Sequence, residues 1–377
     1  MEGEKNISYF KGKNETKVDL DYIKNEMAQF LQLDNLNFLL GAGCSSHVEN
    51  NVEYGIPGMA NLYRGFFEQY RGFDIAGSDA ESIFDGNLEK MLETMEAIAV
   101  ASIVKQTDND IEEKICRVRK YIRNKIIEGL HRTEVLNFYR NFYIKTVTHG
   151  RKHPINIFTT NYDLYNEEAL DFLSFPYNNG FIGTYKRSFN PASYKYAYVE
   201  DMNLSNNIWE RVPNFYNLYK IHGSISWVKN ENNINEIGYE HISEDDTVMI
   251  YPTPLKDRTT LMTPYSDLFR AMETALLKKN SVLITLGYSF ADDHINRIIL
   301  NSLAIPTFKL VIFGDSISRL IEMDDSRIIV INSQDKIHYF KNFVEKAMPD
   351  IQADVKEQID LPVVTELIKA FEGVKHE

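Results

Sequence analysis

The sequence contains very little cysteine. Its 377 residues include only two, Cys44 and Cys116. Two thiols cannot form a disulfide framework, and they cannot supply the four cysteines of a typical structural zinc site. We therefore expect no zinc and no other bound metal, and a protein that works in the reducing environment of the cytoplasm.

Long apolar runs are also missing. No run approaches the roughly 20 residues that a membrane-spanning helix requires. The first 17 residues, MEGEKNISYFKGKNETK, lack the apolar core of a signal peptide. The sequence therefore predicts a soluble protein without a membrane partner.

Positive charge is in deficit, with 41 Lys and Arg residues against 54 Asp and Glu residues and a formal net charge of −13. Such a balance opposes a general attraction to nucleic acid. Residues 114–125 are an exception, because they contain six basic residues and no acidic one on a segment with helical apolar spacing. A solvated helix face explains this pattern, and so does contact with an anionic partner such as DNA. The six residues are Lys114, Arg117, Arg119, Lys120, Arg123 and Lys125.

Apolar, strand-like runs alternate with helical patterns along much of the chain, which is typical of an α/β fold. We expect a Rossmann-like parallel sheet with helices on both faces, plus a helical insertion domain. The predicted domains are a discontinuous Rossmann-like domain (19–60 and 151–350), the helical insertion (61–150) and a C-terminal helical tail (351–377).

Four short polar loops each follow an apolar run. They read GAGCSS from Gly41, TTNYD from Thr159, IHGS from Ile221 and GYSF from Gly287. Parallel strands bring the loops at their carboxyl ends to one edge of a sheet, where ligands bind in α/β folds. The four loops therefore predict one composite site.

Each loop has a functional and a structural interpretation. The glycine-rich turn after Gly41 could present backbone N–H groups to a diphosphate, or it could be only a tight turn. Asn161 and Asp163 could hold a ribose hydroxyl or an amide, or they could bond to the local backbone.

The two later loops are equally open. His222 is placed where it could act as a general base, although a lone histidine is often structural. Asp292 and Asp293 are expected to cap the helix that follows the fourth loop.

Taken in order, these loops resemble the sirtuin (silent information regulator) superfamily, which consumes NAD+. The family pattern GAGxS, GIP, TQNID, HG and G-[ST]-S has counterparts here in GAGCS, GIP from Gly55, TTNYD, IHG and GYS. The resemblance implies a Rossmann-like NAD-binding domain in which Asn161 and His222 are catalytic. It also implies cofactor-binding roles for Gly41, Ala42, Gly43, Ser45, Thr160, Asp163, Gly287 and Ser289.

Departures from the family pattern narrow the expected function. Sirtuin deacylases carry a zinc ribbon with four cysteines, whereas this chain has no cysteine after Cys116. The chain is more similar to sirtuin-like proteins of bacterial anti-phage defence. That resemblance implies an NAD+ glycohydrolase that releases nicotinamide and ADP-ribose and depletes cellular NAD+.

Further expectations concern assembly and control. In length and architecture the chain resembles the partner of a HerA-type hexameric ATPase, and we expect a homo-oligomer. Because constant NAD+ hydrolysis would be toxic, we expect a restrained resting state in which the aromatic segment from Phe175 to Tyr219 gates the pocket. Two alternatives remain open: a non-catalytic NAD- or ADP-ribose-sensing subunit of a DNA-processing ATPase complex, and an ADP-ribosyltransferase or deacylase that uses the same site.

Overall fold

A computed structural model describes most of the chain. The described residues are 6–49, 52–84, 86–105, 110–130, 132–148, 151, 153–203, 208–230, 233–242, 247–250, 263–315 and 318–350. The predicted C-terminal helical tail, residues 351–377, lies outside them. No helix within the described part is long and apolar enough to cross a membrane.

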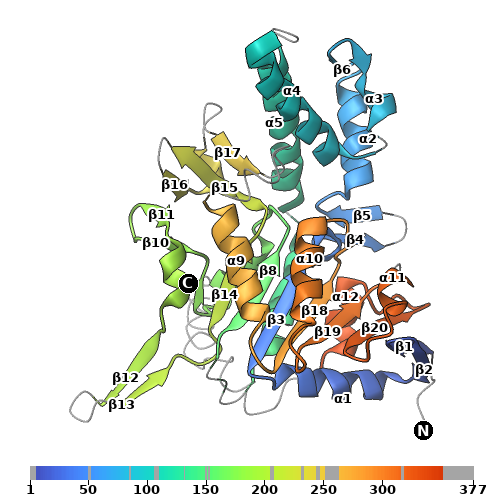
Figure 1. Cartoon of the computed structure of the whole chain (residues 1–377). Coiled ribbons are helices and arrows are strands. Elements are labelled where there is room, and N and C mark those ends of the chain that lie inside the picture. Colours follow the sequence, from blue (N-terminus) through green and yellow to red (C-terminus); the bar gives the residue numbers. More distant parts are fainter. Residues whose placement is uncertain are drawn as a thin grey trace, which may run out of the picture.

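A nine-stranded sheet in the order β2-β1-β20-β19-β18-β3-β8-β14-β9 forms the centre of the molecule (Figure 1). All neighbours from β20 to β9 are parallel, and the β1–β2 hairpin adds an antiparallel edge. The strands are β1 (Ile7–Lys11), β2 (Asn14–Val18), β3 (Asn35–Leu40), β8 (Ile155–Thr159), β9 (Tyr177–Asn178), β14 (Tyr216–Lys220), β18 (Ser281–Leu286), β19 (Lys309–Phe313) and β20 (Ile328–Ser333).

Helices cover both faces of this sheet. Successive residues of β3 point to opposite faces, so that Phe38 and Leu40 join one apolar cluster and Leu39 joins the other. The first cluster includes α1 (Leu20–Leu31), α6 (Thr133–Thr146), α7 (Tyr165–Phe172), α12 (Phe340–Asn342) and η5 (Phe343–Ala347). The second includes α9 (Tyr265–Leu276), α10 (Asp293–Ser302) and α11 (Ser318–Ile321). The predicted fold class is therefore confirmed.

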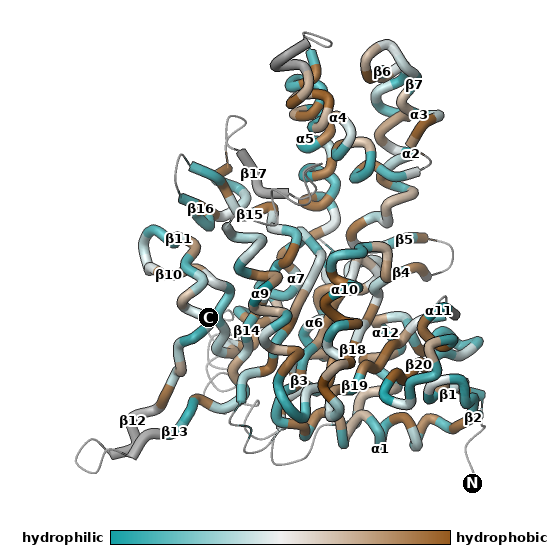
Figure 2. Tube along the Cα trace, viewed as in Figure 1, coloured by the Kyte–Doolittle hydropathy of each residue, from teal (hydrophilic) through white to brown (hydrophobic). Residues whose placement is uncertain are grey.

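A mainly helical segment lies between β3 and β8. It begins with the β4 (Ser46–Glu49) and β5 (Val52–Gly55) hairpin and continues through α2 (Met59–Gln69), α3 (Ala80–Ile83), α4 (Leu88–Lys105), α5 (Ile111–Leu130) and α6, with β6 (Asp74–Ile75) and β7 (Ser78–Asp79) between α2 and α3. Figure 1 shows α2, α4 and α5 standing beyond the carboxyl edge of the sheet. Apolar segments run along α4 and α5 as well as through the central strands (Figure 2). The exact domain boundaries stay predictions.

The basic side of α5 is largely paired. Arg117 lies 2.8 Å from Glu113, and Lys125 lies 2.7 Å from Glu128. In addition, Lys114 pairs with Asp74, Arg119 pairs with Glu96, and Arg123 donates to the backbone carbonyl of Tyr239. Most of the charge that suggested DNA contact is thus neutralised within the chain, and that contact stays a prediction.

Two parts of the fold are absent from the sequence-based expectation. The β1–β2 hairpin lies in what reads as a polar leader. A five-stranded sheet in the order β10-β11-β16-β15-β17 also forms beside the central one. Its strands are β10 (Phe181–Ile182), β11 (Arg187–Phe189), β15 (Gly223–Asn230), β16 (Asn233–Glu236) and β17 (Thr247–Ile250), while β12 (Val199–Asn203) and β13 (Ile208–Arg211) form a separate hairpin.

Candidate active site

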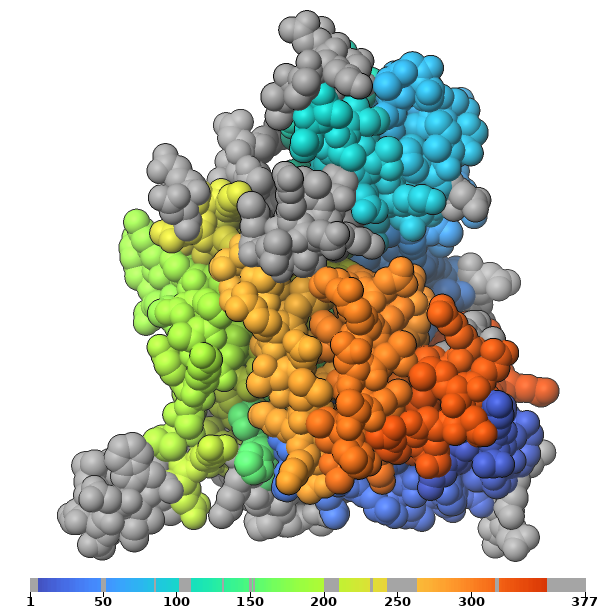
Figure 3. Space-filling view, in the orientation of Figure 1, coloured from blue at the N-terminus to red at the C-terminus, as the bar shows by residue number. Residues whose placement is uncertain are grey.

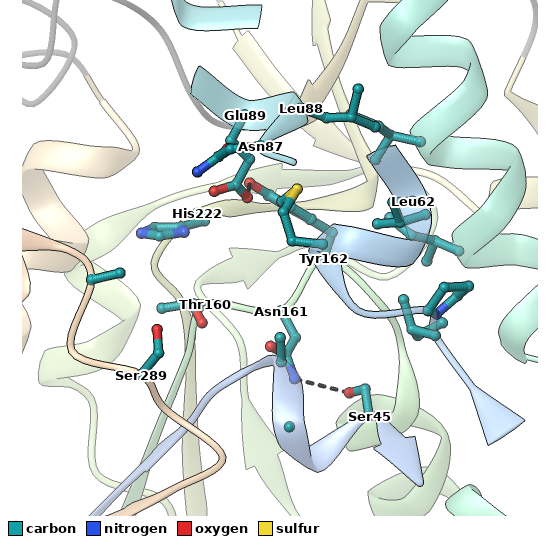
Figure 4. Close-up of a pocket in the computed structure, with 18 of the residues that line it drawn as sticks. Ser45, Leu62, Asn87, Leu88, Glu89, Thr160, Asn161, Tyr162, His222 and Ser289 are labelled. Carbon is teal, nitrogen blue, oxygen red and sulfur yellow. Dashed lines mark hydrogen bonds between the residues drawn. The ribbon is translucent and has the colours of Figure 1, made fainter. Parts of the chain in front are cut away.

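The four predicted loops meet at one cavity at the carboxyl ends of β3, β8, β14 and β18 (Figure 4). Its volume is about 700 Å³, within the range usual for small-molecule sites. Nine of the ten predicted site residues line it, and Gly41 does not. The nine are Ala42, Gly43, Ser45, Thr160, Asn161, Asp163, His222, Gly287 and Ser289.

The glycines of the first and fourth loops allow these loops to touch. A Cβ atom on Gly41 would lie 2.4 Å from the carbonyl oxygen of Gly287, and one on Gly43 would lie 2.9 Å from the Cα of Gly287. The N–H groups of Gly41 and Gly43 donate to the carbonyls of Leu286 and Gly287, so they are not available to a diphosphate. The glycines thus serve loop packing, and their contact with NAD+ phosphates stays a prediction.

We expect Gly287→Ala to destabilise the protein strongly. Gly287 has a φ of +58°, and an added Cβ would lie 2.6 Å from the backbone nitrogen of Cys44. Left-handed strain alone costs an alanine about 1–2 kcal/mol, and the clash should raise the loss to about 3–5 kcal/mol. Urea denaturation of each variant would measure the change in the free energy of unfolding.

Gly72→Ala is the matched control. Gly72 has a φ of +74° but no atom within 4 Å of an added Cβ, so this variant should show the left-handed strain without the clash. Equal losses for the two variants would contradict the proposed loop contact.

Asn161 is held in one orientation by two hydrogen bonds. Its Nδ2 atom donates to the carbonyl oxygen of Gly41 at 3.0 Å and to Ser45 Oγ at 2.9 Å. Because a carbonyl oxygen only accepts, the NH2 group must face Gly41. Figure 4 shows the amide oxygen on the side away from Ser45, toward Thr160 and Ser289. The buried side chain therefore presents a fixed acceptor to the cavity.

Ser45 links Asn161 to a buried polar layer beneath the cavity. Its Oγ atom lies 2.8 Å from the hydroxyl of Tyr139, which is fully buried on α6. Nearby, Asp163 is 2 % exposed and accepts from the backbone N–H of Tyr165 at 3.1 Å. Burial raises the pKa of Asp163, although Lys220 and Ser45 oppose this shift. The second loop is thus anchored from below at both its amide and its carboxylate.

His222 forms a pair with Asp292. Its Nε2 atom lies 3.1 Å from Asp292 Oδ2, while Asp292 Oδ1 accepts from the backbone N–H groups of His294 and Ile295. Burial tends to raise the pKa of Asp292, but the hydrogen bonds and the charge of His222 outweigh it, so the net pKa is lower than usual. Asp292 therefore stays ionised beside the imidazole.

This pair corrects the interpretation of Asp292 as only a helix cap. One carboxylate oxygen does cap α10, as the sequence predicts, and the other orients His222. The two residues are 70 positions apart, so no local pattern reveals their contact. The only sequence signal for this contact is that Asp292 lies just after the loop at the end of a strand.

The far side of the cavity is formed by the helical segment and by the turn between β5 and α2. Apolar side chains of Ile56, Met59, Leu62, Ile122 and Ile126 line it. At one point Tyr162 donates to Glu89 of α4 at 3.1 Å, which joins the second loop to this helix. The sheet edge therefore gives the cavity a mainly polar wall, and the helices give it an apolar wall with Glu89, Lys90 and Glu93 beside it.

The segment expected to gate the pocket does not line it. No described residue of the aromatic segment from Phe175 to Tyr219 is part of the cavity wall, so gating by this segment stays a prediction. Residues 87–90, at the start of α4 and just before it, line the cavity. The aromatic content of the segment indicated that it is ordered, but it did not indicate which part of the fold the segment covers.

One comparison with known proteins, a scan against family models, agrees with the loop motifs. Residues 155–306 match the family model of the SIR2-like domain, and this span contains the second, third and fourth loops. A solved structure described as "Structural Basis for the Mechanism and Regulation of Sir2 Enzymes" is similar over 87 % of this chain and 97 % of that one, with 10 % identity and a TM-score of 0.39. A search of curated protein sequences found no match.

Proposed function

We propose that this chain, with its SIR2-like domain, is an NAD+ glycohydrolase. The observation that carries the proposal is the convergence of Asn161 and the His222–Asp292 pair on one cavity, on loops within the span that matches the SIR2-like model. The cavity volume of about 700 Å³ and its mixed polar and apolar lining suit a nucleotide with an uncharged aromatic leaving group.

The reaction breaks the bond between C1′ of the ribose and the nicotinamide nitrogen. The bonding electrons go to the positively charged nicotinamide ring, which leaves as a neutral molecule without needing an acid. The ribose passes through an oxocarbenium-like transition state, as in glycoside cleavage generally. The fixed amide oxygen of Asn161 would accept from a ribose hydroxyl or from the attacking water and hold it in position.

His222 would then take a proton from the water that attacks C1′. Asp292 accepts from Nε2, so Nδ1 is the nitrogen that receives the proton. The ionised carboxylate stabilises the imidazolium that results. The balanced products are nicotinamide, ADP-ribose and one proton that passes to solvent.

Product analysis tests the proposal. Incubation of the full-length chain with NAD+ should release nicotinamide and free ADP-ribose in equal amounts. ADP-ribose attached to protein would indicate transfer, and O-acetyl-ADP-ribose formed with an acetylated peptide would indicate deacylation. Stabilisation by NAD+ with no product under any activating condition would favour a sensing subunit. Any of these three outcomes would contradict the proposed hydrolysis.

In a cell, such hydrolysis would deplete NAD+, as suits anti-phage defence. The same proposal includes a restrained resting state, released in a homo-oligomer or by a HerA-type ATPase partner. In this proposal α4 is the part that moves, because it carries part of the cavity wall on a segment separate from the sheet. The hydrogen bond from Tyr162 to Glu89 would hold α4 in the resting position.

A further inference from the structure

A second cavity, which we call the amino-end groove, lies away from the proposed active site. Its volume is about 1030 Å³, and it shares no lining residue with the first cavity. It is bounded by α9, by η2 (Pro191–Lys195) and by the first residues of β8 and β14. Figure 3 shows the face on which the yellow-green chain around η2 lies beside the orange chain of α9.

The amino-end groove is positively charged although the chain as a whole is acidic. Five basic residues and one acidic residue, Asp267, line it. The basic residues are Lys195, Arg211, Arg270, Lys278 and Lys279. Three of them, the lysines, are exposed and form no ion pair with any residue that the structure describes. This distinguishes the groove from α5, whose basic side chains are mostly paired.

Aromatic rings are exposed beside these charges. Tyr196 is 56 % exposed and Tyr198 is 44 % exposed. The ring of Tyr198 is stacked on Phe215, with centroids 4.5 Å apart and an interplanar angle of 21°. A ring that is supported on one side and exposed on the other is a surface on which a planar group can stack.

Three hydrogen-bonded asparagines lead into the groove, and the last of them presents an acceptor oxygen there. Asn37 donates to the backbone carbonyl of Val282 and accepts from Asn156, and Asn156 accepts from Asn217. Because the carbonyl of Val282 only accepts, this order fixes all three amides. The last oxygen, Asn217 Oδ1, accepts no hydrogen bond from the residues that the structure describes, although Asn217 is only 8 % exposed.

We propose that the amino-end groove binds single-stranded nucleic acid. The unpaired lysines would neutralise phosphates, the exposed tyrosines would stack with bases, and Asn217 would accept from a base N–H group. A duplex hides the faces of its bases, and an acidic peptide has charge without rings to stack, so neither uses all three features. The inference does not depend on the proposed hydrolysis of NAD+.

Fluorescence anisotropy of the full-length chain with a labelled single-stranded oligonucleotide of about 16 nucleotides tests the proposal. We expect the double variant Lys278→Glu/Lys279→Glu to bind at least about 10-fold more weakly and to reduce the slope of log K against log salt by about 1.4. Tyr198→Ala should weaken binding about 10-fold. The matched control, Lys11→Glu/Lys13→Glu at the β1–β2 edge, changes two exposed lysines that do not line the groove and should change affinity by no more than about 2-fold.

Three results would overturn the proposal. The first is absence of binding at low salt, and the second is an equal loss in the Lys11→Glu/Lys13→Glu control. The third is displacement of the oligonucleotide by polyglutamate at matched charge with no effect of Tyr198→Ala, which would indicate a site for any anionic polymer. Thermal unfolding of each variant confirms that it is folded, independently of NAD+ cleavage.

Discussion

His222→Ala should lower the rate constant for NAD+ cleavage by a factor on the order of 10²–10⁴, because the variant has no base to take the proton from water. Asn161→Ala should lower it by about 10²-fold, because water and ribose lose their fixed acceptor. Nicotinamide release, measured under conditions in which the wild-type chain is active, gives both values.

Two further variants serve as references. His241→Ala changes an exposed histidine that does not line the cavity, and it should leave the rate unchanged. Ser45→Ala removes one of the two acceptors that hold the Asn161 amide and keeps the Gly41 carbonyl, so we expect a smaller loss of about 10-fold. Wild-type rates for both His222→Ala and Asn161→Ala would rule out the assignment of these residues.

Asp292→Asn should reduce kcat by about 10²-fold while changing KM by no more than about 3-fold. Asparagine is as good a helix cap as aspartate, so α10 should keep its start and the thermal midpoint should stay close to that of the wild type. What the variant loses is the negative charge that stabilises protonated His222. The effect therefore falls on the chemical step.

The neighbouring substitution Asp293→Asn is the matched control. It removes the same charge from the same turn. Asp293 does not line the cavity, and it is Asp292 that contacts His222. We expect its kcat and KM to match those of the wild type. Equal losses for the two variants would indicate a general effect of charge, and a drop in thermal midpoint for Asp292→Asn alone would indicate a structural role.

The sequence was most informative where strands are apolar and continuous. β3, β8 and β18 are buried at almost every position, so their sequences are mainly apolar, and the loops after them could be placed at one edge. β2 was missed because its sequence, NETKV, is exposed at four of five positions at the edge of the sheet. A polar edge strand cannot be distinguished from a loop by its pattern.

Within the site, the positions of residues were easier to predict than their contacts. Asn161 and His222 follow strands, and their place in the sequence indicated the cavity that they line. The pairing of His222 with Asp292 and the approach of Gly43 to Gly287 depend on packing between distant segments. The cavity wall formed by α4 was missed for the same reason. Helical spacing predicts which residues of a helix are buried, but it does not predict which part of the protein they pack against.

A crystal structure of the His222→Ala variant with NAD+ tests the central claim most directly, because this variant should bind the dinucleotide without cleaving it. We predict intact NAD+ in the cavity, with C1′ of the nicotinamide ribose facing the site of residue 222 and a ribose hydroxyl or water on the amide oxygen of Asn161. NAD+ bound elsewhere, or bound here with its nicotinamide ribose remote from both residues, would contradict the account.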